Sequence, residues 1–478
     1  MMKYLKSIYK VTGLLAILLC TSGCRKLVEV PGPTTSTNSA NVYTSDATAA
    51  AVLTGIYTNM SSKGVFGGPS STSLYLSLTA DELGFYQTSN NVSYLPFYQN
   101  ALSNSNLIGG DFWSGIYPMI FVTNAAIEGL TNNKLLTPVV DQQLLGEALF
   151  MRAFCYFYLV NIYGDVPLAT STDFKTNQQM ARTAKAQVYQ QIITDLKTAQ
   201  GLLNDYYVDA TALKPSADRL RPSRWAATAL LARAYLYNSD WANAEQQAGL
   251  VIANNSLFTL PALNSAFLAT SKEAIWQLQS VNSGVNTPDG ALFILPVTGP
   301  NNTNFVYLSK NLLNSFETGD QRLTSWVSNV TVPVGTVPTT YAYAYKYKVN
   351  TGSSLTEHEM VLRLGEQYLI RAEARARLGN TTGAASDLNV IRSRAGLPGT
   401  LASGQDDLLT AIYHERQVEL FTEWGHRWLD LKRTGLINTV MSIAAPQKGG
   451  TWNEQKQLFP LPLADLSRNP NLVQNPSY

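Results

Sequence analysis

The chain has 478 residues and a formal net charge of +2, with 45% hydrophobic and only 14% charged residues. Soluble proteins typically carry about 25% charged residues, so amides, hydroxyls and phenols must supply much of the polar surface here. A nearly neutral chain without a basic stripe lacks the electrostatic footprint of a nucleic-acid-binding protein, and we predict no nucleic-acid partner. Aromatic residues make up 10% of the chain. A weakly charged surface of amides, hydroxyls and aromatic rings suits a neutral polar ligand.

The N-terminus has the pattern of an export signal. Three lysines among the first ten residues precede an apolar run over residues 11–19, which is too short to span a bilayer. The small residues TSG then precede Cys24. We predict a lipoprotein signal peptide over residues 1–23 and lipid attachment at Cys24. More than one acyl chain there gives a stable membrane anchor.

The cysteines provide no disulfide framework. Cys20 belongs to the predicted signal peptide and Cys24 takes lipid, so Cys155 stands alone in the mature chain. It lies in an apolar stretch, FMRAFCYFYL, which predicts a buried and inert thiol. Stability must therefore come from the packing of a core.

Residues 24–41 are rich in Pro, Thr and Ser, which predicts an extended tether between the lipid and the folded part. We predict that residues 42–478 form a single domain. The segments described next indicate that this domain is mainly α-helical, with long irregular loops and short β-hairpins inserted into it.

Five segments have the apolar spacing of helices: 141–164, 224–238, 241–254, 366–380 and 382–395. The second and third form a pair that aligns with the fourth and fifth. In this alignment ARAYL at 232–236 matches ARARL at 374–378, and a short turn and further alanines follow each. Small residues at helix crossings are how tetratricopeptide (TPR) hairpins pack. The pattern predicts a TPR-like helical-hairpin scaffold.

Two insertions interrupt these helices, near 61–106 and 270–350. The first is rich in Ser, Asn, Gly and Tyr and has no sustained helical period. The second has short alternating runs, such as AIWQL at 274–278, and loops rich in Gly, Pro and Asn. Irregular loops on a rigid scaffold often carry binding sites, so we predict the ligand site in these insertions.

Both insertions supply candidate ligand contacts. Sugars bind by stacking their C–H faces on aromatic rings, while amides and carboxylates bond their hydroxyls. The candidates of these types are Asp81, Tyr86, Asn91, Tyr94, Phe97, Tyr98, Tyr307, Trp326 and Tyr343, with Tyr345 beside them. Other tryptophans lie in periodic segments and are predicted to belong to the core: Trp113, Trp225, Trp276, Trp424 and Trp428.

Four charged side chains near the C-terminus are spaced four residues apart: Glu415, Glu419, Glu423 and Arg427. A continuous helix would place them on one face, where paired carboxylates could act as acid and base on a glycoside or hold a metal. We favour a structural interpretation. Glu423 and Arg427 have the order of an i,i+4 ion pair, and Asp430 and Arg433 that of an i,i+3 pair.

The sequence contains no catalytic or cofactor motif. His414 and the following glutamate lack the second histidine of the HExxH zinc motif. Neither a Gly-Xaa-Ser-Xaa-Gly elbow nor a phosphate-binding loop occurs. We therefore predict a non-enzymatic binding protein without catalytic residues, metal ligands or a cofactor.

Several stretches resemble, in order, the SusD/RagB family. They are CRKLVEVP at 24–31, WSGIYPMIFVTN at 113–124, EALFMRAFCYFYLVNIYGDVP at 147–167, AASDLNVIRSRAGL at 384–397, ERQVELFTEWGHRWLDLKRTG at 415–435 and FPLPLADLSRNPNLVQNPSY at 459–478. The resemblance implies a SusD-like fold with TPR helices and a lipid anchor in the cell outer membrane, at the surface. It also implies capture of a nutrient, usually a glycan.

The resemblance further implies a partner, a SusC-type TonB-dependent transporter. The protein would lie as a lid on that barrel and hand over its glycan. Two alternatives remain open: peptide capture, as in RagB-like relatives, and a lid or interaction subunit without ligand affinity of its own. The aromatic loops and the low charge favour a glycan.

Overall fold

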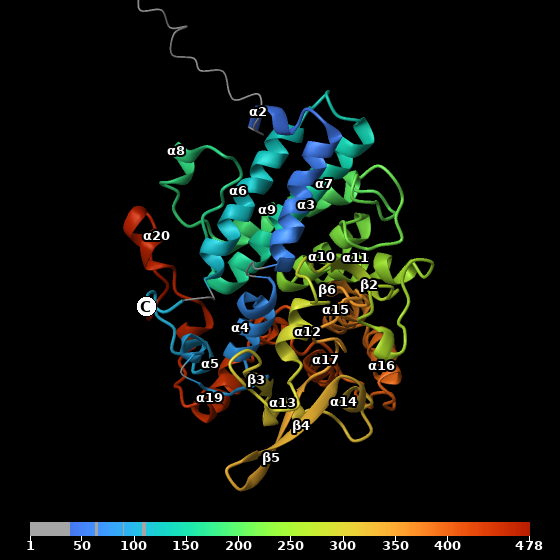
Figure 1. Ribbon diagram of the computed structural model, residues 1–478. Coiled ribbons are helices and arrows are strands. Elements are labelled where there is room, and N and C mark those ends of the chain that lie inside the picture. The colour runs from blue at the N-terminus through green and yellow to red at the C-terminus, as the bar shows by residue number, and fades with distance from the viewer. Residues whose placement is uncertain (1–38, 63–65, 89, 108–110) are drawn as a thin grey trace, which may run out of the picture.

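The computed structural model describes residues 39–62, 66–88, 90–107 and 111–478. The predicted signal peptide, the lipid-attachment residue Cys24 and most of the predicted tether lie outside these residues. The described part is mainly helical and contains three two-stranded sheets (Figure 1), as the sequence predicts. The single-domain boundary at residue 42 stays a prediction.

The helices of the first half are α2 (Ser39–Val42), α3 (Asp46–Ser62), α4 (Thr72–Thr79), α5 (Leu95–Tyr98), α6 (Phe112–Leu130), α7 (Pro138–Tyr163), α8 (Phe174–Asn177), α9 (Lys185–Leu202), α10 (Arg224–Tyr237) and α11 (Trp241–Ala253). Those of the second half are α12 (Pro288–Phe293), α13 (Lys310–Leu313), α14 (Arg322–Ser325), α15 (Leu364–Arg377), α16 (Thr381–Arg394), α17 (Gln405–Glu419), α18 (His426–Arg433), α19 (Ile437–Gln447) and α20 (Leu463–Arg468). The strands are β1 (Leu83–Phe85), β2 (Ala274–Leu278), β3 (Val306–Leu308), β4 (Val327–Val334), β5 (Val337–Ala344) and β6 (Glu359–Arg363).

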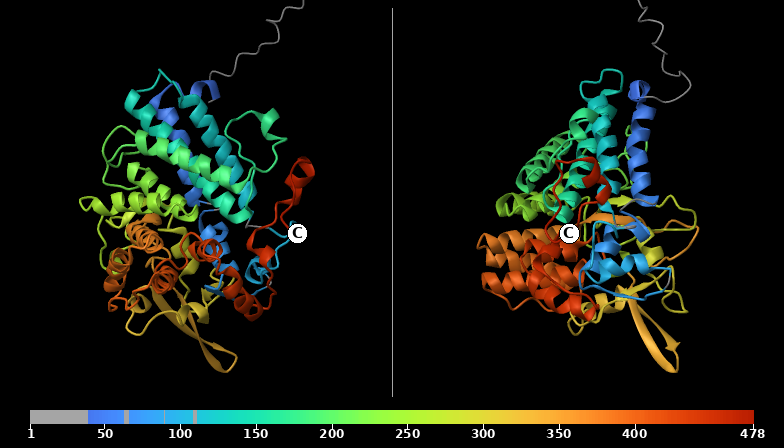
Figure 2. Two further views of the ribbon diagram at one scale, coloured as in Figure 1. Left: turned by 180° about the vertical axis from the view of Figure 1, so that it is seen from behind. Right: turned by 90° about the vertical axis from the view of Figure 1, so that its left-hand side faces the viewer.

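Seven helices form one row, in which α7, α9, α10, α11, α15, α16 and α17 each pack against the next. Figure 2 shows this row passing from the green helices to the orange ones. The predicted pairs appear as α10 with α11 and α15 with α16, and alanines are fully buried where the helices meet, among them Ala232, Ala234, Ala374 and Ala376. The assignment of these pairs as TPR repeats stays a prediction.

Helix α7 forms the centre of the core. It is long and apolar enough to cross a membrane, but 94% of its most apolar stretch is buried inside the protein, as in a core helix. Its Phe150 and Phe154 rings meet Trp276 edge-on at centroid distances of 5.1 and 5.6 Å. Cys155 is buried and free, and burial raises the pKa of its thiol, so the prediction of a buried thiol is confirmed.

Four of the five tryptophans predicted to lie in the core are buried: Trp113, Trp276, Trp424 and Trp428. Trp225 is half-buried. The predicted strand at 274–278 is β2, which pairs antiparallel with β6. The hairpin of β4 and β5 projects from the molecule at the bottom of Figure 1.

Helix α4 lies in a segment where the sequence shows no helical period. All eight of its residues are buried, so it has no polar face that would produce such a period. Its start is defined instead by a cap, because the Ser71 side chain accepts a hydrogen bond from the Leu74 amide. The helix leads directly toward β1 and fixes where that strand begins.

The prediction of one helical face through the charged C-terminal segment is wrong. Helix α17 ends before residues 420–425 and α18 follows them, so Glu423 lies in the turn between the two helices. Within this turn Gly425 has a φ of 73°. A Cβ at Gly425 would stand 2.3 Å from the Leu76 side chain of α4. The chain therefore turns at a position that only glycine fits.

Replacing Gly425 by Ala should destabilise the fold more than replacing Gly435, which has a similar φ of 76° but nothing within 4 Å of its Cβ position. The left-handed backbone alone costs a non-glycine residue about 1–2 kcal/mol. Gly425→Ala adds an overpacking cost of about 1–3 kcal/mol against Leu76. Urea unfolding of both variants measures the difference, and equal losses would contradict this packing.

Candidate functional site

A short sheet brings the two insertions together. Strand β1 of the first pairs antiparallel with β3 of the second, and Gly84 lies opposite Tyr307. The Tyr86 amide continues this pairing by donating to the Phe305 carbonyl at 2.8 Å. Side chains from segments far apart in the sequence therefore share one surface.

The Tyr307 ring lies directly on the backbone of Gly84. A Cβ at Gly84 would stand 2.2 Å from Cε2 of Tyr307, so any side chain at this position would push the ring away. Glycine within a strand commonly marks such a close approach. The ring is consequently held in one orientation by the sheet itself.

Tyr341 of β5 joins the rings into a cluster. It meets Tyr307 edge-on at a centroid distance of 5.0 Å and Tyr86 at 6.4 Å. The fourth ring, Tyr98 of α5, lies close enough to Tyr307 for the two phenols to interact electrostatically. Tyr86 is 38% exposed and the other three rings are partly exposed. We call Tyr86, Tyr98, Tyr307 and Tyr341 the aromatic surface.

The phenol groups of Tyr98 and Tyr307 stay protonated at neutral pH. Burial, and then the neighbouring Tyr307, raise the pKa of Tyr98. Burial, and then Tyr341, raise the pKa of Tyr307. Each neutral phenol can donate and accept a hydrogen bond. The surface thus offers apolar ring faces together with polar edges.

Two predicted contacts lie buried and serve the fold. Arg427 bonds both carboxylate oxygens of Asp81, at 2.8 and 2.9 Å. Burial opposes the charge of Asp81, but Arg427 outweighs it and lowers the pKa of that carboxyl. Trp326 is 0% exposed, and its indole N–H donates to the Leu263 carbonyl at 3.0 Å. Neither side chain lies where a ligand at the surface reaches it.

Asn91 and Phe97 are buried as well. The Asn91 amide donates to the Tyr86 carbonyl at 2.9 Å and accepts from the Thr88 amide at 2.8 Å. It therefore closes the loop that carries Tyr86. Phe97 packs edge-on against the Tyr75 ring at 4.4 Å. Asn91 thus positions the segment that carries Tyr86, whereas Phe97 anchors α5, which carries Tyr98, to the core.

The last two predicted contacts are half-buried. Tyr94 packs against Phe305 at a centroid distance of 4.4 Å and stacks on Tyr75 at 5.4 Å. Tyr343 lies further along β5, and its ring meets Tyr345 at 6.0 Å. They border the surface, whereas the predicted Tyr86, Tyr98 and Tyr307 lie within it.

Tyr341 is not among the predicted contacts. Alternate residues of a strand point to the same side, so extending the tyrosine series 343 and 345 by one step backwards identifies it. The signal was present as the run YAYAY. What the sequence did not reveal is that β5 passes beside β3.

The charged residues with the spacing of a catalytic pair belong to a buried ion-pair network. Arg363 bonds Glu419 and Glu423, both at 2.7 Å. Arg322 bonds Glu415 at 2.7 Å and Glu419 at 2.9 Å. These carboxylates are buried and paired with arginines, which agrees with a structural role. The expected pair of Glu423 with Arg427 is wrong, because Glu423 bonds Arg363 and Arg427 bonds Asp81. Across the described ranges, no group of three or more His, Cys, Asp and Glu side chains is placed to hold a metal ion.

Two family models match the chain. One, described as "SusD family", matches residues 168–478. The other, described as "Starch-binding associating with outer membrane", matches residues 35–236. The first covers more than half of the chain, so this protein belongs to the SusD family.

Individual relatives agree with this assignment. SusD-like protein P2 of Formosa agariphila is 28% identical to the chain, over 98% of this chain and 99% of its own length. Among solved structures, a SusD superfamily protein from Bacteroides vulgatus superimposes with a TM-score of 0.77 at 21% identity, covering 91% of this chain and 99% of that one. A laminarin binding SusD-like protein has a TM-score of 0.72 at 24% identity, covering 90% and 99%. At these identities the structural similarity establishes the fold.

Proposed function

We propose that this protein binds a glycan at the aromatic surface, without making or breaking a bond in it. The observation that carries the proposal is the fixed arrangement of Tyr307 on Gly84, with Tyr341 and Tyr86 edge-on around it. The rings need little ordering on binding, which lowers the entropic cost of association.

The chemistry of the surface suits a neutral saccharide. Sugar rings present apolar C–H faces that stack on tyrosine, and their hydroxyls exchange hydrogen bonds with neutral phenols. A phosphate polymer or a strongly acidic peptide would instead need exposed cations. The chain as a whole has only 14% charged residues and a net charge of +2.

The family supports the same function. One matching model is described as starch-binding and as associating with the outer membrane, and one structural neighbour as laminarin binding. We propose that lipid at Cys24 anchors this protein to the outer membrane, facing the cell surface. We further propose that it passes its glycan to a SusC-type TonB-dependent transporter.

The proposal is tested by affinity electrophoresis of the mature protein, lacking residues 1–24, in gels containing plant, host or microbial polysaccharides. We expect one class of polysaccharide to retard migration. A gel without polysaccharide provides the reference mobility. Unchanged mobility in every gel, together with saturable binding of a peptide mixture in solution, would favour peptide capture. Binding of neither polysaccharide nor peptide would favour a lid or interaction subunit without ligand affinity of its own.

A further inference from the structure

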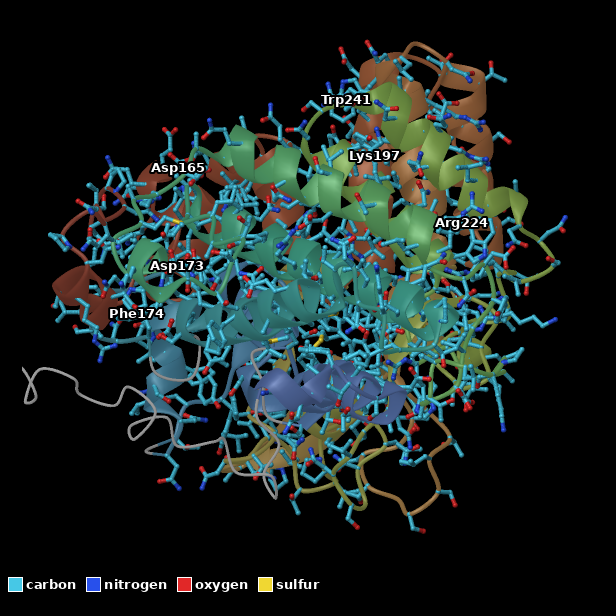
Figure 3. All side chains as sticks on the ribbon, turned by 90° about the horizontal axis from the view of Figure 1, so that it is seen from above. Asp165, Asp173, Phe174, Lys197, Arg224 and Trp241 are labelled. Atoms are coloured by element: carbon cyan, nitrogen blue, oxygen red, sulfur yellow. The ribbon has the colours of Figure 1, made fainter. Side chains whose placement is uncertain are left out.

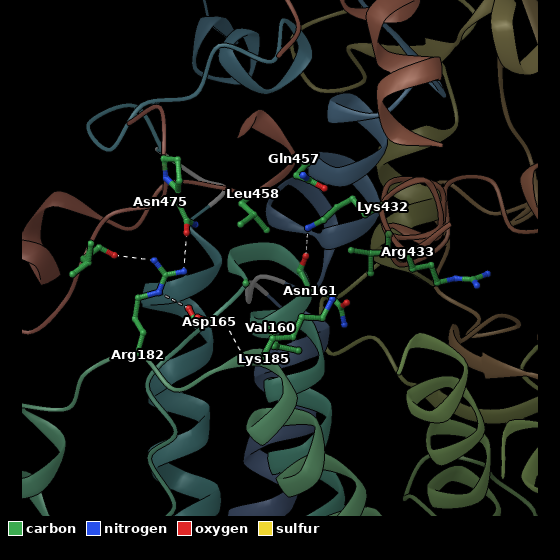
Figure 4. Close-up of a pocket in the computed structure, with 14 residues that line it drawn as sticks. Val160, Asn161, Asp165, Arg182, Lys185, Lys432, Arg433, Gln457, Leu458 and Asn475 are labelled. Carbon is green, nitrogen blue, oxygen red and sulfur yellow. Dashed lines mark hydrogen bonds between the residues drawn. The ribbon is translucent and has the colours of Figure 1, made fainter. Parts of the chain in front are cut away.

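A pocket lies away from the aromatic surface, where the end of α7, the start of α9, α18 and the C-terminal segment meet (Figure 4). Its volume is about 600 Å³, within the range of about 300–1,000 Å³ found for small-molecule sites. Its polar lining comprises Asn161, Asp165, Arg182, Lys185, Lys432, Arg433, Gln457 and Asn475. It shares no lining residue with the aromatic surface, so its occupancy is independent of the proposed glycan capture.

Arg182 builds one wall of this pocket. Its guanidinium donates to the carbonyls of Asp165 at 2.7 Å, Val473 at 2.8 Å and Tyr163 at 3.0 Å, and to the Asn475 side chain at 2.7 Å. These acceptors are all neutral, so they hold the C-terminal segment without cancelling the charge of Arg182. The wall is rigid and positive.

Two lysines face the same space. Lys432 donates to the Asn161 carbonyl, as Figure 4 shows, and neither it nor Lys185 has a salt bridge to any described residue. Burial, and then the charge of Lys185, hold the pKa of Lys432 well below its ordinary value. The neighbouring Arg433 points away and bonds Glu373 at 2.6 Å. The depressed pKa favours the neutral amine of Lys432, so the positive charge of the pocket comes from Arg182 and Lys185, which both interact with the Asp165 carboxylate.

The single carboxylate of the lining does not neutralise these charges. Asp165 accepts a hydrogen bond from the backbone amide of Lys185 at 2.8 Å, at the start of α9. Two cations, Arg182 and Lys185, and the amine of Lys432 thus share one carboxylate. The positive end of the α9 dipole points to the same place and adds to the attraction for an anion.

We propose that this pocket binds the oxyanion of a small polar ligand: a carboxylate, sulfate or phosphate group, free or carried on a sugar. The anion would favour the protonated form of Lys432 and add a second negative charge beside Lys185, and such charge-assisted hydrogen bonds are stronger than neutral ones. The remaining pocket volume accommodates a monosaccharide-sized body.

The test is calorimetric titration of the mature protein with three probes: inorganic phosphate, glucuronate and glucose. Two variants remove one amine each, Lys185→Gln and Lys432→Met. Lys197→Gln is the matched control, because Lys197 is exposed on the same helix α9 but does not line the pocket (Figure 3). Lys185 is also exposed at the rim, so its substitution should leave folding intact even if Lys432→Met does not.

We expect phosphate or glucuronate to bind saturably, with the affinity reduced about tenfold or more in Lys185→Gln. Lys197→Gln should retain wild-type affinity. Tighter binding of glucuronate than phosphate identifies a sugar-borne anion as the ligand class, and the reverse order identifies a free oxyanion. Absence of saturable binding, equal binding of glucose and glucuronate, or equal losses in Lys185→Gln and Lys197→Gln would each overturn the proposal.

Discussion

Replacing Tyr307 and Tyr341 together by Ala should abolish retardation of the protein by its polysaccharide. Each stacked ring contributes about 1–2 kcal/mol when apolar burial and ring geometry are combined, so each single variant should bind about 5- to 30-fold more weakly. The centroids of the two rings are 5.0 Å apart and the rings share one ligand surface. Loss of both rings should therefore reduce the affinity below the limit of detection. The measurement is the dissociation constant from mobility against polysaccharide concentration.

A matched control distinguishes this surface from exposed tyrosine in general. Tyr206 is 40% exposed, close to the 38% of Tyr86, but it lies in the loop after α9, outside the aromatic surface. Tyr206→Ala should therefore keep wild-type retardation, whereas Tyr86→Ala should weaken it. Full retardation of the Tyr307/Tyr341 double variant, with its fold intact by circular dichroism, would place the glycan elsewhere.

Glu419→Gln should cost about 3–5 kcal/mol of the free energy of unfolding, the loss typical of breaking a buried ion pair. Glu419 is 0% exposed and bonds Arg322, Arg363 and Arg394. The glutamine keeps the shape but leaves three buried guanidinium groups short of a counter-charge. Urea unfolding, read as a change in midpoint at constant slope, measures the loss.

The control for this variant is Glu245→Gln. Glu245 bonds Arg375 at 2.8 Å, but both side chains are partly exposed. Water screens such a pair, so its loss should cost less than about 1 kcal/mol. Similar destabilisation by the two substitutions would contradict the assignment of Glu419 to a buried structural network.

The same network makes the contribution of Glu419 to the free energy of unfolding dependent on pH. Burial alone would raise the pKa of Glu419, but Arg394, Arg363 and Arg322 outweigh it and hold the pKa well below its ordinary value of about 4.3. A carboxyl with a depressed folded-state pKa stabilises the fold above its unfolded pKa and loses that contribution as pH falls. The stability gap between wild type and Glu419→Gln should therefore be constant near neutrality and narrow below about pH 4.

Much of the helical scaffold was predictable because its helices are long or have a clear stop signal. Helix α10 begins and ends within a residue of the predicted segment, and α7 ends at Tyr163, where the following Gly164 has a φ of 77° that suits glycine. Helix α4 was not predictable in this way, because it has only eight residues and all of them are buried, so neither length nor period distinguishes it from a strand. The turn after α17 was not predicted, because the four-residue spacing of charged side chains continues across it.

The sequence identified the two insertions that carry the candidate site, but not which of their side chains are exposed. Residue type identified Tyr86 and Tyr307 but also selected Asp81 and Trp326, which are buried by partners remote in sequence. Arg427 forms an ion pair with Asp81, and the indole N–H of Trp326 donates to the Leu263 carbonyl. Composition shows which side chains suit a ligand, whereas tertiary pairing decides which of them remain at the surface.

A crystal structure of the mature protein with an oligosaccharide from the retarding polysaccharide would show directly whether the glycan binds on the aromatic surface. The expected result is sugar rings in contact with Tyr307 and Tyr341, with Tyr86 at the edge of the ligand. Sugar bound along the α15–α17 helices, with the tyrosines uncovered, would contradict the claim and assign ligand capture to the helical scaffold.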